Sequence, residues 1–172
     1  MFDTNGKQMT EETTTETAAT EQSDQVQIGI LGQYVKDMSF ENPNAAETLQ
    51  KMQNDKPQID ISVNVNARQM AEEIFEVVLK VSAAAKHDDK TAFVVELEYA
   101  GLFGAKNLPK ENLQPFLLVE APRLIFPFAR RIVADATRDG GYPPLLLDPV
   151  DFGALYQQQM AAAAEKENKS VN

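Results

Sequence analysis

The sequence predicts an α+β fold in which a four-stranded antiparallel sheet is followed by two helices. The first observation is that apolar and polar residues alternate in four segments between residues 27 and 99, as they do in strands. The second is that apolar residues after position 110 recur at spacings of three and four, which is typical of amphipathic helices. Strands with one polar face favour an antiparallel sheet, because parallel strands are usually covered on both faces.

The first strand is expected within residues 27–41. Its alternation places Asp37, Ser39 and Glu41 on one face. The opposite face is predicted to carry a larger apolar set, Ile28, Ile30, Tyr34, Met38 and Phe40. An Asn-Pro turn then ends the strand and opens a long connection, residues 40–58.

Three further strands follow this connection. Residues 58–66 alternate most strictly, with Ile59, Ile61, Val63 and Val65 on one face. Residues 74–85 and 91–99 alternate in the same way, and the polar stretch 86–90 between them is predicted to be a hairpin turn. The predicted core faces of these two strands are Phe75, Val77, Leu79 and Val81, and Phe93, Val95, Leu97 and Tyr99.

The first expected helix lies between the strands and a pair of glycines. Apolar residues recur with helical spacing from Leu124 to Ala136, and Gly140 and Gly141 mark the end of the helix. Prolines at positions 115, 122 and 127 predict that its start is irregular or kinked.

The second expected helix follows the segment "GGYPPLLL". Asp148 is its predicted N-cap, Pro149 its first residue, and Asp151 adds negative charge near its N-terminus. An apolar stripe beginning at Phe152 and reaching Met160 would then pack this helix against the sheet or a second subunit.

The chain is expected to form one folded domain between two polar ends. Residues 1–24 are rich in Thr and Glu, and are predicted to be a disordered acidic N-terminal arm. Residues 25–165 are the predicted domain, and residues 166–172 a flexible tail. A chain of 172 residues, 43% of them apolar, is long enough to bury one core of this size.

Composition also limits the classes of function. A net charge of -10 disfavours nucleic acid as a partner, because that binding needs clustered Lys and Arg, and it favours cationic partners. The sequence contains no Cys, which excludes disulfides and thiolate metal sites. No apolar run approaches the roughly 18 residues that a membrane span requires. We therefore expect a cytoplasmic protein without stable membrane insertion.

Candidate catalytic groups are few. The single histidine, His87, stands between Lys86 and Asp88 in the predicted turn, where solvation is a better interpretation than catalysis. Glu96 and Glu98 share a strand face, but no His or Cys accompanies them, so we interpret them as solvated acids. The sequence carries no phosphate-binding glycine loop or nucleophile motif. These observations predict a protein that is not an enzyme and needs no cofactor or metal.

Four ordered blocks resemble the SecB family of protein-export chaperones: "YVKDMSFENPNA", "EEIFEVVLKVSAAA", "TAFVVELEYAGLF" and "APRLIFPFARRIVADATRDGGYPPLLLDPVDFGALY". The resemblance covers the chain from about Gln27 to Met160, whereas the acidic arm is longer than is usual in the family. It implies a homotetramer, built as a dimer of dimers with the long helices packed in the middle. It also implies a chaperone without enzyme activity or bound metal, which holds precursor proteins unfolded in the cytosol and passes them to the SecA ATPase.

The resemblance assigns a SecA-binding role to positions on the first and fourth strands. Asp37, Glu41, Val94 and Glu96 match the family's docking positions, and Glu98 is added because it has the same parity as Glu96. A row of acids on one sheet face suits a cationic partner, although such acids often only keep a sheet soluble.

The resemblance also implies client-binding grooves near the connection after the first strand and near the segment between the helices. The candidate client-binding residues there are Phe40, Leu49, Met52, Tyr142, Leu145, Leu147 and Phe152. The flexible thioether of Met52 suits contact with many different chains. For each of these residues, a place in the ordinary core is an equally good interpretation.

Two other functions remain open from the sequence. The apolar loops would also suit a carrier that closes over one small apolar ligand. Alternatively, the chain would be a specialised chaperone that escorts one labile partner, as the toxin-linked relatives of SecB do. A monomeric mass with a bound small molecule would indicate the carrier, and one dominant co-purifying protein would indicate the escort.

Overall fold

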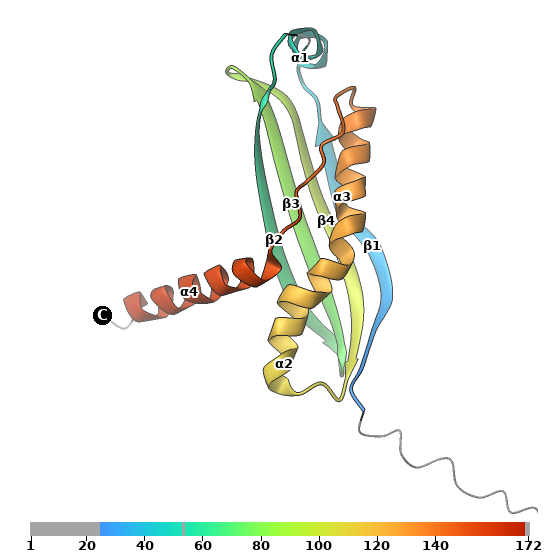
Figure 1. Ribbon diagram of the computed structural model, residues 1–172, viewed down its shortest axis with the longest axis vertical. Helices are drawn as coiled ribbons and strands as arrows, with labels where there is room; N and C mark the ends of the chain where they lie inside the picture. The colour runs from blue at the N-terminus through green and yellow to red at the C-terminus, as the bar shows by residue number, and fades with distance from the viewer. Residues whose placement is uncertain (1–24, 53, 171–172) are drawn as a thin grey trace, which may run out of the picture.

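The computed structural model describes residues 25–52 and 54–170 of the chain (Figure 1). The predicted arm, residues 1–24, lies outside the described residues, as do the last two positions of the predicted tail, 171–172. The elements follow in the order β1 (Gln27–Glu41), α1 (Ala45–Lys51), β2 (Gln58–Ala71), β3 (Ile74–His87), β4 (Lys90–Lys106), α2 (Lys110–Pro115), η1 (Phe116–Glu120), α3 (Ala121–Asp139) and α4 (Phe152–Ser170).

The predicted α+β class is confirmed, with a four-stranded sheet in the order β1-β4-β3-β2. All three strand pairs are antiparallel, and hairpin turns join β2 to β3 and β3 to β4. The connection from β1 to β2 crosses one end of the sheet and contains α1, where the sequence predicted no regular element. β1 and β2 are therefore the two edge strands.

The core lies between the sheet and α3, which crosses in front of β4 in Figure 1. All eight residues predicted for the core faces of β3 and β4 are buried: Phe75, Val77, Leu79, Val81, Phe93, Val95, Leu97 and Tyr99. Only part of the predicted apolar face of β2 is buried. Val65 is buried, but Ile59 and Ile61 are exposed, because α3 and its neighbours do not reach that end of the edge strand.

Two irregularities in β1 change the side-chain parity that the sequence predicted. The pairing with β4 shifts between Ile30 and Gly32 and again between Val35 and Asp37. Each extra residue in a strand reverses the alternation beyond it. Tyr34 therefore lies on the face opposite to Met38 and Phe40, and its predicted place beside them is wrong.

The irregular helix start that the prolines predict is confirmed. The chain is α-helical over Lys110–Pro115, widens to a π-helix over Phe116–Glu120 and returns to α-helix in α3. Pro122 lacks an N–H and its ring crowds the carbonyl four residues earlier, and the wider turn relieves this conflict. The helix ends at Gly140, as predicted, and Gly141 adopts a left-handed φ of 91°.

The last helix begins later than the sequence predicted. α4 starts at Phe152, and Asp151 caps it, because its Oδ1 accepts a hydrogen bond of 3.0 Å from the N–H of Ala154. Asp148 is therefore not the N-cap. The backbone stays helical to Ser170, so α4 extends into the segment 166–172 that the sequence predicted as a flexible tail. α4 projects away from the sheet in Figure 1.

Replacing Gly101 with alanine is expected to destabilise the core. A Cβ at this position would lie 2.6 Å from Phe103 Cε2 and 3.0 Å from Ile125 Cγ2, and both side chains are fully buried. Overpacking of this kind costs about 1–3 kcal/mol. Gly32→Ala is the matched control, since nothing lies within 4 Å of its Cβ position. Urea unfolding of both variants checks the difference, and equal stability would contradict this account of the packing.

Candidate functional site

The five predicted SecA-binding residues lie together on the open face of the sheet, the face that α3 does not cover. Asp37 pairs with Glu98, Ser39 with Glu96 and Glu41 with Val94 across β1 and β4. Residues paired directly across an antiparallel ladder point to the same side of the sheet. The structure therefore brings the predicted residues into one acidic row, defined here as Asp37, Glu41, Glu96 and Glu98, with Val94 beside Glu41.

The acidic row is accessible and only partly neutralised. Asp37, Glu41 and Glu96 are exposed, and in the described parts of the chain none of them forms a salt bridge. Glu98 is partly buried and accepts a 3.2 Å hydrogen bond from the Lys80 ammonium on β3. Three free carboxylates on two adjacent strands present a negative surface that attracts cationic groups.

A polar cluster on the same face was not found by sequence reasoning. The Glu76 side chain is 3% exposed and binds three donors on two other strands. Arg68 Nε lies 2.6 Å and Lys36 Nζ 2.9 Å from its Oε2, and the Tyr34 hydroxyl donates to its Oε1 at 2.5 Å. We call Glu76, Arg68, Lys36 and Tyr34 the Glu76 cluster. The apolar-polar alternation of β3 gave Glu76 an outward position, but it gave no sign of the three partners.

Hydrogen bonds set the charge states of the Glu76 cluster. The bond from Arg68, followed by those from Tyr34 and Lys36, lowers the pKa of Glu76 from 4.5 to about 2. Burial opposes this change but does not outweigh it. The bond to Glu76 raises the pKa of Tyr34 above its ordinary value. The cluster therefore contains a carboxylate, two cations and a neutral phenol at neutral pH.

Four of the candidate client-binding residues gather where α1 meets the end of α3. Phe40 stacks on Phe93 with a centroid distance of 6.0 Å, and Phe93 contacts Tyr142 at 4.9 Å. Leu49 packs against Gly141, and Met52 is partly buried against the same core. The Tyr142 hydroxyl is buried, and lies 2.7 Å from Asn42 Oδ1 and 2.8 Å from Thr48 Oγ1.

The other three candidates lie along the connection to α4 and at its start. Leu145 is partly buried, and its N–H donates a 2.9 Å hydrogen bond to the Thr137 hydroxyl. Leu147 and Phe152 are 2% and 1% exposed, and Phe152 packs edge-on against Phe126. Together with Tyr142, which is 3% exposed, they belong to the core in the isolated chain. Leu146, which the sequence did not single out, is the exposed leucine of this segment, at 64%.

The sequence from residue 21 to residue 163 matches the family described as "Preprotein translocase subunit SecB". The chain belongs to the SecB family. Similar proteins include the protein-export protein SecB of Sphingopyxis alaskensis, 54% identical over 79% of this chain and 78% of that one. The protein-export protein SecB of Maricaulis maris is 56% identical over 80% of each chain, and that of Afipia carboxidovorans is 51% identical over 92% of this chain and 98% of its own.

A solved structure with the same fold is a SecB-like chaperone of Mycobacterium tuberculosis, determined in complex with an antitoxin peptide. It superimposes with a TM-score of 0.56 over 72% of this chain and 90% of that chain, at 16% identity. The SecB fold that the sequence blocks indicated is therefore confirmed. At this low identity the comparison concerns the fold alone.

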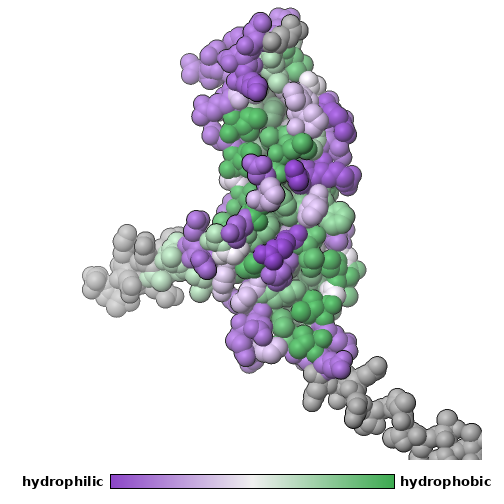
Figure 2. All heavy atoms as spheres, in the orientation of Figure 1, coloured by the Kyte–Doolittle hydropathy of each residue, from purple (hydrophilic) through white to green (hydrophobic). Residues whose placement is uncertain are grey.

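The helix-covered side of this SecB-family chain exposes further apolar side chains, as Figure 2 shows. Leu124 and Phe128 of α3 are 48% and 44% exposed, and Phe128 stacks on Tyr99 at a centroid distance of 6.4 Å. Val35 and Met38 of β1 are exposed beside them on the same side of the sheet. The helical stripe predicted from Leu124 to Ala136 therefore divides between the core and this exposed apolar strip.

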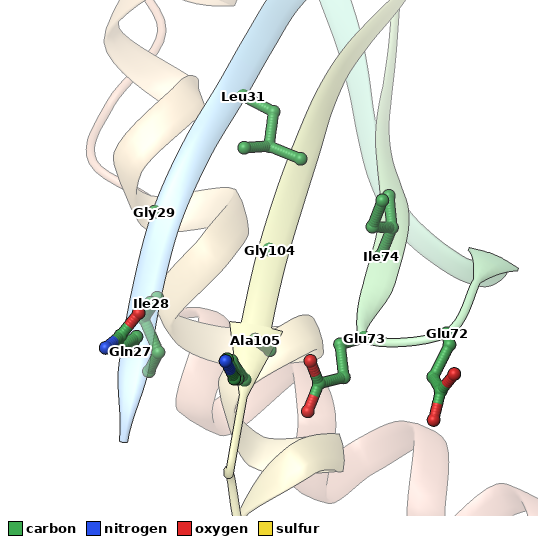
Figure 3. A pocket seen from close by; sticks show the side chains of 10 residues that line it. Gln27, Ile28, Gly29, Leu31, Glu72, Glu73, Ile74, Gly104 and Ala105 are labelled. Atoms are coloured by element: carbon green, nitrogen blue, oxygen red, sulfur yellow. The ribbon is translucent and has the colours of Figure 1, made fainter. Parts of the chain in front are cut away.

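A hollow of about 430 Å³ (Figure 3) lies where β1 begins and β4 ends, at the opposite end of the sheet from α1 in Figure 1. Gly29 and Gly104 leave its floor without side chains, and Leu31 and Ile74 supply apolar walls. Glu72 and Glu73 stand at its rim, on the turn that joins β2 and β3. No residue of this hollow was among the sequence-based candidates of the SecB resemblance.

His87 is buried, at 3% exposure, so the sequence-based expectation of a solvated histidine in the turn is wrong. It is the last residue of β3 and shares the core parity of Ala85. Within the described residues of this SecB-family chain, no group of three His, Asp or Glu side chains is arranged to hold a metal. Also within these residues, no helix is long and apolar enough to cross a membrane.

Proposed function

We propose that this chain is a cytoplasmic holdase that keeps precursor proteins unfolded and delivers them to the SecA ATPase for export. The observation that carries the proposal is the match to the SecB family over residues 21–163, together with relatives named as protein-export proteins. A chaperone of this kind needs one surface that binds unfolded precursor proteins and another that binds SecA, and two of the surfaces described above suit these roles. One is acidic and faces away from the helices, and the other is apolar and lies beside them.

The acidic row is the proposed docking surface for SecA. Its carboxylates lie on two paired strands, so the rigid sheet fixes their spacing. Val94 adds a partly buried apolar contact next to Glu41. Charges arranged in this way increase the association rate and select the partner more than they add affinity. Binding of SecA should therefore weaken as salt concentration rises.

The proposed client-binding surface combines exposed and partly buried apolar side chains near α1 and the segment before α4. Phe40, Leu49, Met52 and Leu145 are partly buried and supply its walls, and exposed Leu146 reaches outward. The buried candidates Tyr142, Leu147 and Phe152 support it from beneath. Apolar contact without fixed polar partners suits many unrelated segments, because no hydrogen bond has to be matched.

The exposed apolar strip on α3 and β1 supports a homotetramer built as a dimer of dimers. Isolated chains rarely leave several large apolar side chains exposed side by side, unless another protein covers them. Val35, Met38, Leu124 and Phe128 form such a strip here. In the proposed tetramer the α3 helices meet in the middle and the open faces with their acidic rows remain outside.

Holdase activity and native mass together test the proposal. The purified full chain should suppress aggregation of a chemically unfolded precursor protein, and native mass spectrometry should give the mass of four chains. A monomer carrying a bound small molecule would instead indicate the carrier of small apolar ligands. One tightly co-purifying protein, with no protection of other unfolded chains, would indicate the specialised escort.

A further inference from the structure

Besides Lys80, which pairs with Glu98, two cations stand on the open face close to the acidic row. Lys36 directly precedes Asp37, and a pocket of about 200 Å³ is lined by Lys36, Arg68, Glu76 and Glu98. A free lysine beside these acids would form ion pairs with them and reduce the negative charge that a partner meets. In the structure Lys36 and Arg68 are instead bound to Glu76, at 2.9 Å and 2.6 Å.

Glu76 also holds the irregular part of β1. The register passes from Val35 opposite Tyr99 to Asp37 opposite Glu98, so Lys36 is the extra residue of a β-bulge. Tyr34 donates to Glu76 from one side of the bulge and Lys36 from the bulge itself. Because this bulge reverses the alternation, it determines that Asp37 points to the open face.

β4, the strand between β1 and β3, leaves room for the β1 side chains that reach Glu76. Tyr34 and Lys36 lie on β1 and Glu76 on β3, so their side chains must cross β4. Ala100 of β4 lies opposite Tyr34 and is fully buried, and it pairs on its other side with Val78. A methyl group is small enough to lie beneath the crossing side chains. Arg68 reaches Glu76 directly, since the two residues are paired across β2 and β3.

We infer that Glu76 is a positioning residue of the docking face, which fixes the β1 bulge and keeps Lys36 and Arg68 away from Asp37 and Glu98. Asp37 thereby stays available to a cationic partner, and Glu98 keeps Lys80 as its one paired cation among the described residues. This inference rests on the proposed docking of SecA to that face. It assigns a role to a residue that does not itself touch the partner.

The first measurement tests the cluster without SecA. The phenol of Tyr34 is titrated by ultraviolet absorbance, as the difference between the full chain and its Tyr34→Phe variant. In Glu76→Gln the titration of Tyr34 should shift to lower pH, because the acceptor that stabilises the neutral phenol has lost its charge. A titration that does not move would overturn the inference, since Glu76 would not hold Tyr34 in solution.

The second measurement is SecA affinity at low salt. Glu76→Gln should bind SecA roughly tenfold more weakly, because the released cations offset the acidic row. The double variant Glu76→Gln with Lys36→Met should recover part of that loss, because it removes the released lysine but leaves Arg68 released. Lys36→Met alone keeps Glu76 paired with Arg68 and should bind at least as tightly as the unmodified chain.

The outcomes separate this inference from the proposed function. If Glu76→Gln binds SecA as well as the unmodified chain, or if the double variant recovers nothing, the positioning role is overturned while docking stands. If the unmodified chain itself does not bind SecA, the proposed docking fails and the inference falls with it. Lys36→Met retains the buried carboxylate and two of its partners, so it gives a result even if Glu76→Gln does not fold.

Discussion

Replacing Glu96 with lysine is expected to weaken SecA binding by roughly tenfold to a hundredfold, while protection of unfolded clients stays nearly unchanged. Glu96 is exposed in the acidic row and has no salt bridge within the described residues, so reversal of its charge would act directly on the proposed partner. A lysine there would also repel the cationic groups that the row attracts. Asp37→Lys should act in the same direction, because Asp37 faces the same side.

Glu111→Lys is the matched control for this charge reversal. Glu111 is exposed on α2, away from the open face, and its replacement changes the net charge by the same amount. The affinity of each variant for SecA is measured by titration at low and high salt, next to an aggregation assay with an unfolded client. Equal losses for Glu96→Lys and Glu111→Lys would show that net charge matters and the acidic row does not.

The stability difference between the unmodified chain and Glu76→Gln is expected to depend strongly on pH. The folded-state pKa of Glu76 is about 2, below the ordinary 4.5, so its ionised form stabilises the folded state. This contribution is fully present above pH 4.5 and is lost as the pH falls towards about 2. A pKa shift of this size corresponds to a contribution of up to about 3 kcal/mol to the free energy of unfolding.

Denaturant unfolding at fixed chain concentration, from pH 6 to pH 2 in several steps, checks this prediction; the interval is set by the two pKa values of about 2 and 4.5. Gln resembles the protonated carboxyl in shape and charge, so the two proteins should approach equal stability at the acid end. Tyr34→Phe keeps the Glu76 carboxylate with both cations. It should therefore still lose stability at acid pH, but less than the unmodified chain does. A difference that stays constant with pH would contradict the assigned role of the Glu76 carboxylate.

The acidic row shows why part of the site was predictable from sequence. Strand parity placed Glu96 and Glu98 on one face, and the structure confirms this because β4 pairs with β3 across them without interruption. The same reasoning placed Asp37 correctly but Tyr34 wrongly. The two residues differ because the bulge at Lys36 lies between them, and no Gly or Pro at this position indicates a bulge in the sequence. The bulge is stabilised by Glu76, a residue 40 positions further along the chain.

The apolar candidates show a different limit. Phe40, Tyr142 and Phe152 were selected by type and by the family resemblance, and both criteria fit a core residue as well as a binding residue. Their burial depends on what covers them, such as Phe93 over Tyr142 and Phe126 against Phe152. Leu146 is the exposed residue in a run of three leucines, since Leu145 is partly buried and Leu147 is buried. No local sequence pattern distinguishes Leu146 from the other two.

The sequence by itself determined the strands, the two long helices and the family, because side-chain periodicity is a local property that each segment carries alone. It also determined that Asp37 and Glu41 share one face of their strand and that Glu96 and Glu98 share one face of theirs, because the alternation is unbroken within each pair. Only the tertiary structure decided which strands are neighbours, where β1 bulges and that Glu76 is buried beneath two cations and a phenol. These features arise from contacts between residues far apart in the chain, and such contacts leave no period in the sequence.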